Sequence, residues 1–343
     1  MKIKTLKIKD FKVFESANLN FDGKNIVIFG ENGSGKSSIL RAITLLISKP
    51  ELELENKNSK VVLTHSITEN EMDIKYNKEK SSIEAELILE KEEDINENVF
   101  ISYGIHRFLT EMPQVSKLEL QKLSEDMLKI VENAILSMLQ DCSCICIDRE
   151  NNKVCIEKYG KKLSLKHLSD GEKTTLSLFA DIAQKLISKN RELENPFTSK
   201  AIVLIDEVEL HLHPKLQRKI MPKLSEIFPN IQFIVTTHSP QVLGEIGNNF
   251  KIFSLEDNED GAELFEIERL DFFDINYILE NFMSTDSINQ KTLEFINNMY
   301  SLIYDGKLDE AQRAVKKLKA IVGENHEDVV KAELMIRKAK LSK

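Results

Sequence analysis

The residues Gly30-Glu31-Asn32-Gly33-Ser34-Gly35-Lys36-Ser37 decide the fold that this sequence predicts. They match the pattern G-x-x-x-x-G-K-[ST], in which the backbone N–H groups of a glycine-rich turn surround a phosphate. The apolar run before them, 25–29, predicts a buried strand, and residues 38–46 predict a helix. A glycine loop between a strand and a helix N-terminus is a phosphate site, so we expect the chain to bind a nucleoside triphosphate.

Two side chains of this loop have separate expected tasks. We expect Lys36 to reach the β- and γ-phosphates of ATP and the Ser37 hydroxyl to ligate Mg²⁺. A chance glycine-rich turn is the alternative interpretation, and the fit of both flanking segments disfavours it. The remaining expected nucleotide contacts come from the loop itself, at Asn32, Gly33, Ser34, Gly35 and Ser38.

Two apolar runs farther along the chain end in polar side chains. Residues 200–205 predict a buried parallel strand followed by Asp206 and Glu207, and residues 231–237 predict a second strand ending at His238. In such sheets the nucleotide lies beyond the carboxyl ends of the strands. We therefore expect Asp206 to hold Mg²⁺, Glu207 to deprotonate water, and His238 to donate to the γ-phosphate.

The segment 168–173, Leu-Ser-Asp-Gly-Glu-Lys, opens a predicted helix that runs to Ile187. Ser169 and Glu172 have the spacing of a capping box, which is a purely structural explanation. Gly171 in the first turn leaves backbone N–H groups accessible, and such a helix terminus binds anions. Both interpretations can hold together.

Histidine and cysteine pairs are the other candidate metal ligands. His211 and His213 bracket one leucine, but no third ligand is patterned with them, so hydrogen-bonding roles near the nucleotide are favoured. Cys142, Cys144 and Cys146 alternate along a predicted strand. We expect them to be buried and reduced, in preference to a metal site.

Composition restricts the class of protein. The 343 residues allow one large α/β domain with an appendage or two modest domains, and the 41% hydrophobic and 30% charged fractions are typical of soluble globular chains. A net charge of −9 argues against coating nucleic acid with the whole surface. No run is apolar enough for a secretory signal or a membrane span, which predicts a cytoplasmic protein without membrane contact.

The rest of the chain predicts elements around the phosphate loop. Alternation over 2–15 predicts one strand with a solvated face, whereas 49–80 is polar and predicts irregular structure. We expect a head at 1–255 and a helical region at 256–343. Further expected elements are strands at 82–89 (in a side sheet), 99–104 and 251–255, helices at 118–139, 290–303, 308–322 and 329–340, and a side sheet and helical lobe at about 50–165.

The ordered motifs closely resemble the ABC-type ATPase heads of the SMC, RecF and OLD group. The resemblance covers about residues 1–255 and implies an α/β P-loop NTPase fold with a mixed central sheet, a β side sheet and a helical lobe. The matching segments are the leading strand at 6–14, the Walker A motif at 30–37, the signature motif at 168–172, the Walker B motif at 202–207 and the switch histidine His238.

The resemblance also implies a mechanism. Two heads pair head to tail, and each ATP lies between Walker A of one chain and the signature of the other. Ser169 and Gly171 would then contact the γ-phosphate in trans, Glu207 would be the general base, and His238 would sense the γ-phosphate. Lys12 lies where such heads carry a basic residue near the phosphates. ATP would close a homodimer or higher oligomer, and hydrolysis would reopen it.

The sequence departs from that group at three places. The Q-loop glutamine is not assigned, with Gln114 and Gln121 as the two alternatives. Arg41 stands where many SMC-like heads have an acidic residue. The interval from Ser37 to Ser169 is too short for a coiled-coil arm, which disfavours work that spans chromosomes.

Four short motifs narrow the resemblance to the stand-alone ATPases of the Septu anti-phage kind, which usually act with a separate HNH nuclease. The tail carries neither a Toprim pattern nor an HNH signature, so we expect a partner to cleave DNA. A RecF-like DNA-maintenance clamp is the alternative, and a transporter motor is disfavoured because the signature reads LSDGE. The four motifs are 103–107, 209–214, 237–241 and 274–276.

Overall fold

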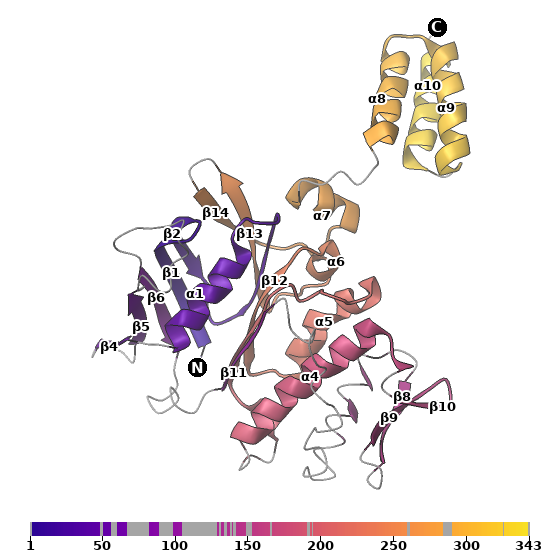
Figure 1. Cartoon of the computed structure of the whole chain (residues 1–343). Helices are drawn as coiled ribbons and strands as arrows, with labels where there is room; N and C mark the ends of the chain where they lie inside the picture. The colour runs from indigo at the N-terminus through magenta and orange to yellow at the C-terminus, as the bar shows by residue number, and fades with distance from the viewer. Residues whose placement is uncertain are drawn as a thin grey trace. The chain divides into compact units, whose positions relative to one another are not determined.

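The computed structural model covers the whole chain (Figure 1). It describes residues 2–48, 51–55, 60–66, 82–88, 99–104, 129, 132–133, 136–137, 139, 142–148, 153–164, 167–190, 193, 195–258, 261–283, 290–324 and 326–341. The chain divides into two compact units, Met1–Ile278 and Leu279–Lys343. The boundary expected after residue 255 falls inside a strand, and the two units are described separately.

A six-stranded sheet is the centre of the first unit (Figure 1). Its order is β14-β13-β3-β12-β11-β7, with β14 antiparallel and the other five strands parallel, so the predicted mixed sheet is confirmed. Every residue of β11 and β12 is buried, as a parallel sheet covered on both faces requires. The bounds are β3 Asn25–Gly30, β7 Val99–Tyr103, β11 Ala201–Ile205, β12 Ile231–Thr237, β13 Phe250–Asn258 and β14 Gly261–Ile267.

The register of this sheet brings three loops to one edge. Thr237 at the end of β12 pairs with Phe29 of β3, and Ile205 at the end of β11 pairs with both Val235 and Tyr103. Because parallel strands end at the same edge, the loops that follow β3, β11 and β12 lie close together. That edge is where the sequence predicts the nucleotide.

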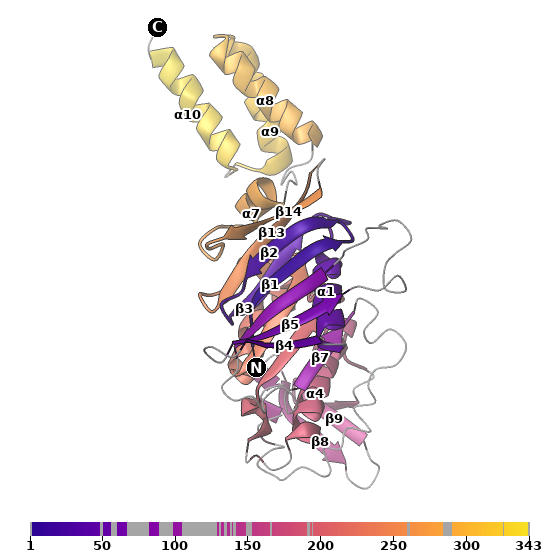
Figure 2. The same ribbon diagram turned by 90° about the vertical axis from the view of Figure 1, so that its left-hand side faces the viewer.

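A second, antiparallel sheet packs on the other side of α1 (Lys36–Ser48), in the order β2-β1-β6-β5-β4 (Figures 1 and 2). One apolar core joins the two sheets and α1, and Ile8, Phe21, Ile43 and Leu204 all belong to it. The sheet holds α1, and with it the phosphate loop, against the central strands. The strands are β1 Lys2–Phe11, β2 Phe14–Asn20, β4 Glu51–Glu55, β5 Lys60–Ser66 and β6 Ser82–Ile88.

The buried side chain of Gln232 fastens the two sheets together. From β12 it accepts a hydrogen bond from the Ile3 N–H at 2.7 Å and donates to the carbonyl oxygens of Ile3 and Lys24 at 3.0 and 2.8 Å. An amide with no exposure is tolerated here because both of its ends are paired.

The leading segment and the segment after α1 differ from expectation. The single strand predicted for 2–15 is wrong: the chain turns back after Phe11, with Lys12 at φ 51°, and β1 pairs with β2 as a hairpin. The irregular structure predicted for 49–80 is also wrong where the chain is described, since β4 and β5 pair there. These short strands are stabilised by pairing with other strands. Local hydrophobic periodicity carries no information about such pairing, so it did not predict them.

Helices cover the other face of the central sheet, where α4 and α5 lie opposite α1 (Figure 1). An aromatic cluster fills that face: the Phe228 ring lies 5.7 Å from Phe197, 6.0 Å from Phe179 and 6.5 Å from Phe233. The predicted helix after the signature segment is confirmed as α4. The bounds are α4 Asp170–Lys189, a 3₁₀ turn Pro196–Thr198, α5 Pro214–Ile227 and α6 Pro240–Leu243.

A third, small sheet contains β8 (Cys142–Asp148), β9 (Lys153–Lys158) and β10 (Lys161–Ser164). Cys142 and Cys144 are only half-buried, so the predicted burial of these thiols is wrong; the side chain of Cys146 is outside the described residues. A register shift between Cys142 and Cys144 interrupts the pairing of β8 with β9. The helix expected at 118–139 falls almost wholly outside the described part of the chain.

The second unit is a three-helix bundle of α8 (Gln290–Tyr304), α9 (Leu308–Val322) and α10 (Glu327–Leu341), and the three predicted tail helices are thereby confirmed. Gly306 and Gly323, at φ 74° and 93°, end the first two helices. Helix α7 (Ile275–Phe282), which precedes the bundle, was not expected. Among the described residues no helix combines the length and apolarity that crossing a membrane requires.

Candidate nucleotide-binding site

The side chain of Lys36 lies inside the curve of the phosphate loop. It is 4% exposed, and its Nζ donates hydrogen bonds to the carbonyl oxygens of Gly30 at 3.0 Å and Glu31 at 2.6 Å. Both acceptors belong to the loop, so the ammonium group is held by neutral oxygens at the position where the motif needs a cation for phosphate.

Three carboxylates act on the same ammonium group. Burial lowers the pKa of Lys36, and the attraction of Asp206, Glu207 and Glu209 opposes that decrease. The loop after β3 and the loop after β11 therefore face one another, with one cation beside three anions. This arrangement places a cation that suits phosphate oxygens beside carboxylates that suit a metal ion.

Glycine is required at two positions of the loop and leaves room at a third. A Cβ on Gly30 (φ 155°) would lie 2.2 Å from the Leu255 carbonyl oxygen, and one on Gly35 (φ 108°) would lie 2.3 Å from Val13 Cγ2. At Gly33 (φ 85°) a Cβ would meet nothing within 4 Å. Leu255 of β13 and Val13 of the β1–β2 turn therefore pack against the loop, whereas the loop is open at Gly33.

The open side of the loop fits a bound triphosphate. Ser34 Oγ is buried and has no hydrogen-bond partner among the described residues, which is costly unless a ligand supplies one. Ser37 and Asn32 are exposed, and Ser38 is half-buried in the first turn of α1. Lys12 lies in the β1–β2 turn, next to Val13, and Val13 contacts the phosphate loop at Gly35.

The Thr236 hydroxyl holds the end of β11 in place. It donates to Asp206 Oδ1 at 2.5 Å and accepts from the Glu207 N–H at 2.8 Å. The Asp206 N–H also donates to the Tyr103 carbonyl oxygen at 2.9 Å. The sequence alone assigns no role to Thr236, although a hydroxyl directly after the apolar run Phe233–Val235 of β12 was the available signal.

Glu207 has a strained backbone and faces His238. Its φ is 48°, a conformation that costs a non-glycine residue about 1–3 kcal/mol. The Val208 N–H donates to the Thr236 carbonyl oxygen at 3.0 Å and helps to hold that turn. Glu207 Oε1 lies 3.9 Å from His238 Nε2, and the two side chains are 32% and 28% exposed, open to a substrate.

Glu209 joins the same group from the loop after Glu207. Its Oε1 accepts a hydrogen bond from the backbone N–H of His238 at 2.5 Å. Its Oε2 is buried and lacks a hydrogen-bond partner within the described ranges. The sequence alone assigned no role to Glu209, because its contact to His238 joins residues 29 positions apart.

The signature segment begins α4 with the predicted capping box. Glu172 N–H donates to Ser169 Oγ at 3.4 Å, and the Ser169 N–H donates to Glu172 Oε2 at 2.9 Å. A Cβ on Gly171 would lie 3.0 Å from the His211 carbonyl oxygen, so the helix packs tightly on the loop that follows Glu207. Among the described residues, no hydrogen bond joins Ser169 to the phosphate loop of its own chain.

An ion pair connects this helix terminus to the third sheet. Lys158 Nζ lies 2.5 Å from Glu172 Oε1, and both side chains are largely buried, at 20% and 12% exposure. Burial acts to raise the pKa of Glu172, but the hydrogen bonds from Lys158 and Ser169 outweigh it and the pKa is lowered. The hydrogen bond to Glu172 correspondingly raises the pKa of Lys158.

The two loop histidines have structural positions. His213 is the N-cap of α5 and its Nδ1 accepts from the Lys215 N–H at 3.3 Å, while His211 adopts φ 65° beside Gly171. Within the residues that the structure describes, no group of three side chains could hold a metal ion by itself. Arg41 is exposed on α1, and both Gln114 and Gln121 fall outside the described residues.

Comparison with known proteins identifies relatives of this chain. The retron Vc95 probable ATPase of Vibrio cholerae serotype O1 biovar El Tor is 36% identical over 53% of this chain and 36% of its own length. The Septu protein PtuA of Bacillus mycoides (strain KBAB4) is 29% identical over 87% of this chain and 48% of its own length. The chain thus spans about half, or less, of the length of these relatives.

Among solved structures, the SMC head domain from Thermotoga maritima is 19% identical, covers 78% of this chain and 100% of its own, and superposes with a TM-score of 0.48. The RecF/RecN/SMC N terminal domain family matches residues 2–260, which is most of the chain. The expected resemblance is therefore confirmed. The chain belongs to the RecF/RecN/SMC N-terminal domain family and has the mixed α/β sheet and phosphate loop of a P-loop fold.

Proposed function

We propose that this protein hydrolyses ATP, dimerises around it, and thereby gates a separate HNH nuclease in defence against phage. The observation that carries the ATPase chemistry is the meeting of Lys36 with Asp206, Glu207 and His238 at one edge of the central sheet. These four residues come from three loops that the parallel register brings together.

The side chains divide the chemistry of hydrolysis among them. Lys36 balances phosphate charge, and Glu207 takes a proton from the attacking water, whose oxygen forms a bond to the γ-phosphorus as the bond to the ADP oxygen breaks. His238, 3.9 Å from Glu207, donates to the γ-phosphate. Mg²⁺, held by Ser37 and Asp206, would neutralise charge developing on the phosphates.

The signature segment serves the second nucleotide of a dimer. Ser169 is accessible at the N-terminus of α4, where backbone N–H groups favour an anion. Its hydroxyl and the N–H of Gly171 contact the γ-phosphate bound by the partner head. Because Gly171 packs against the loop that follows Glu207, each signature is seated on the catalytic loop of its own chain.

The proposal of a nuclease partner is based on the similarity of this chain to the Septu protein PtuA. The Septu protein PtuA matches 87% of this chain, and the motifs 103–107, 209–214, 237–241 and 274–276 are those on which the Septu resemblance was recognised. In this proposal the ATP-bound dimer holds the nuclease in one state and hydrolysis releases it. DNA is the substrate of the partner.

Affinity purification from the native host tests this proposal. The tagged chain and its Lys36→Ala variant are purified with and without ATP, and mass spectrometry identifies stoichiometric partners. A protein with an HNH signature, whose cleavage of plasmid DNA changes with ATP in the wild-type complex alone, supports the proposal. A complex whose cleavage is the same with Lys36→Ala contradicts the gating step.

A RecF-like clamp that binds DNA without a nuclease is the second candidate. A DNA replication and repair protein RecF of Allorhizobium ampelinum (strain ATCC BAA-846 / DSM 112012 / S4) is 41% identical, but over 13% of this chain only. Recovery of the chain with DNA and no second protein would favour this clamp.

A further inference from the structure

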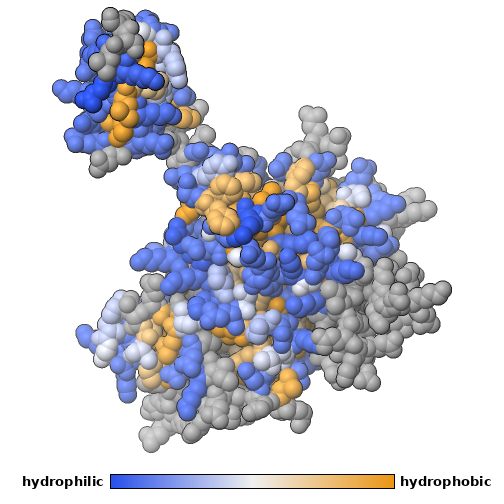
Figure 3. Space-filling model, turned by 180° about the vertical axis from the view of Figure 1, so that it is seen from behind, coloured by the Kyte–Doolittle hydropathy of each residue, from blue (hydrophilic) through white to orange (hydrophobic). Residues whose placement is uncertain are grey.

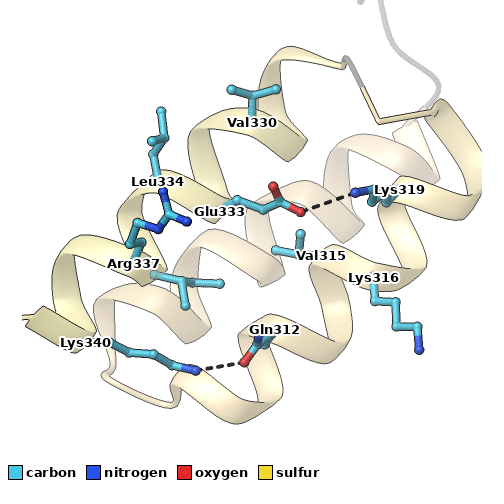
Figure 4. Close-up of a pocket in the computed structure, with 10 residues that line it drawn as sticks. Gln312, Val315, Lys316, Lys319, Val330, Glu333, Leu334, Arg337 and Lys340 are labelled. Atoms are coloured by element: carbon cyan, nitrogen blue, oxygen red, sulfur yellow. Dashed lines mark hydrogen bonds and ion pairs between the residues drawn. The ribbon is translucent and has the colours of Figure 1, made fainter.

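A groove of about 790 Å³ lies between α9 and α10 of the C-terminal bundle (Figure 4). Val315 and Ile336 line it as buried residues that also belong to the core of the bundle. Val330 and Leu334 line it from α10 and remain 44% and 59% exposed. These two are four residues apart, so they lie on one face of the helix and form a short apolar stripe. On the face of the molecule drawn in Figure 3, apolar side chains of the C-terminal bundle gather in a strip between hydrophilic ones.

The rim of the groove is strongly cationic. Four basic side chains line it against one carboxylate, Glu333, in a chain whose net charge is −9. Figure 4 shows Glu333 directed at Lys319, at 3.7 Å, which already compensates its charge. The four basic residues are Lys316, Lys319, Arg337 and Lys340.

Three of these four cations carry charge that no carboxylate among the described residues compensates. Lys319 is engaged by carboxylates, whereas Lys340 donates only to the neutral amide oxygen of Gln312, at 2.8 Å. Lys316 and Arg337 form no hydrogen bond or ion pair with the residues described, and both are exposed. Lys316 lines the groove from α9, and Arg337 lines it from α10, three residues after Leu334.

We propose that this groove is a docking site for an acidic amphipathic helix of a partner protein. Apolar side chains of that helix, spaced three or four residues apart, cover Val330 and Leu334. Carboxylates beside them pair with Lys316 and Arg337. The proposal concerns the C-terminal unit alone and holds or fails independently of the ATPase chemistry and of the partner's activity.

Charge and shape favour a protein helix over nucleic acid. A phosphate backbone would pair with the cations of the rim but would leave the exposed side chains of Val330 and Leu334 uncovered. An amphipathic helix matches both features, because it buries apolar area and carries its charge at the edges. The attraction between the positive charges of the rim and the negative charges of the docked helix also sets the orientation in which the helix binds.

Photocrosslinking of the full-length chain in its native host tests the proposal. p-Benzoyl-phenylalanine replaces Leu334 in one variant and Lys317 in the control, because Lys317 is also exposed, on α9, but does not line the groove. We expect a crosslink from position 334 at least ten times stronger than from position 317. Mass spectrometry of the crosslinked peptide should identify an acidic segment with apolar residues at helical spacing.

A synthetic peptide of that segment then gives the affinity for the full-length chain. Lys316→Glu with Arg337→Glu should weaken binding at least tenfold, as should Leu334→Ser, while Lys317→Glu with Lys338→Glu changes it less than threefold. Lys338 is exposed on α10 outside the groove, so the two double variants carry the same change of net charge. Unchanged circular dichroism excludes unfolding as the cause.

Several outcomes overturn the proposal. They are the absence of a crosslink from position 334, equal crosslinks from positions 334 and 317, and a crosslink to nucleic acid or to a second copy of this chain. A basic or neutral crosslinked segment, or equal weakening by the two double variants, also overturns it. A partner that meets every criterion but cleaves no DNA would sustain the docking site and contradict the proposed nuclease.

Discussion

The Glu209 carboxylate accepts a hydrogen bond from the backbone N–H of His238 at 2.5 Å. This contact ties the loop after β11 to the loop after β12, and it lies beside the 3.9 Å approach of Glu207 to His238. Glu209, which has neither proposed role itself, therefore holds the proposed base Glu207 and the proposed γ-phosphate donor His238 at a set separation. Because reaction rates fall steeply when reacting groups shift by an ångström, this tie bears on turnover.

Glu209→Ala should lower kcat for ATP about ten- to hundredfold, because His238 loses the acceptor that positions it. Glu209→Gln keeps an acceptor oxygen and should stay within about threefold of the wild type. Steady-state ATPase kinetics measure both variants. Equal losses in kcat for the two variants would show that the charge of Glu209, and not its hydrogen bond, is what matters.

Glu207→Gln should lower kcat by about 10²–10⁴ while ATP still binds, because the base is lost and the Asp206 carboxylate is spared. Light scattering after size exclusion should find a dimer that persists with ATP. Glu256→Gln is the matched control, since Glu256 is exposed on β13. Turnover of Glu207→Gln at the wild-type rate would exclude Glu207 as the base.

Thr236→Val should impair both stability and catalysis. It removes the hydroxyl that donates to Asp206 and accepts from the Glu207 N–H, at a cost of about 1–3 kcal/mol for leaving buried groups unpaired. Thr236→Ser retains the hydroxyl and should restore most of both properties. Urea unfolding and ATPase rates are the measurements, and a Val variant as active as the Ser variant would contradict the assigned role.

Ser169→Arg should abolish hydrolysis without weakening the binding of ATP to one chain, because the proposed contact is made to the partner's nucleotide. Ser169→Asn keeps an N-cap at this position and separates loss of the cap, about 1 kcal/mol, from loss of the trans contact. Ser188→Arg places the same charge at the exposed far end of α4 as a control. Wild-type turnover in Ser169→Arg would remove the trans site.

The Lys158–Glu172 pair should make stability depend on pH at both extremes. The pKa of Glu172 is held below 4.5, so its contribution is present above that pH and is lost as pH falls through the lowered value. The pKa of Lys158 is held above 10.5, so its contribution is present below that pH and is lost as pH rises through the raised value.

Glu172→Gln should therefore lower the free energy of unfolding by about 1 kcal/mol at neutral pH, and by progressively less as pH falls below 4.5. Chemical unfolding at a series of pH values measures this difference. Asp170→Asn, whose side chain is 90% exposed in its pair with Lys173, is the control. A difference from the wild type that does not change with pH would contradict the assignment.

Sequence pattern located the loop residues of the candidate site well because each follows a strongly apolar strand. The run 231–237 predicted β12 with its full length, and the run 200–205 predicted β11 to within one residue. The capping box at Ser169 is likewise a local feature, spaced three residues apart, and it is formed as predicted. Such signals involve neighbours in sequence, which is why they can be recognised without the fold.

Hydrophobic periodicity did not predict the segments whose structure depends on pairing with another strand. Nothing local marks the turn at Lys12, since the alternation continues through it. The hairpin forms by antiparallel pairing of β1 with β2, and Val13 in its turn packs against Gly35 of the phosphate loop. Strands β4 and β5 form by antiparallel pairing within the side sheet. A short strand is stable only with its partner, so its existence depends on the sheet.

Local sequence features are enough to identify the phosphate loop, the strands that carry Asp206, Glu207 and His238, and the family of the chain. The folded chain was needed to see the Thr236 hydroxyl on Asp206, the Glu209 carboxylate on the His238 N–H, and the cationic groove between α9 and α10. The difference lies in how far apart in sequence the interacting residues are. Motifs and periodicity record neighbours along the chain, whereas side-chain contacts across parallel strands and packed helices depend on a register that only the folded chain defines.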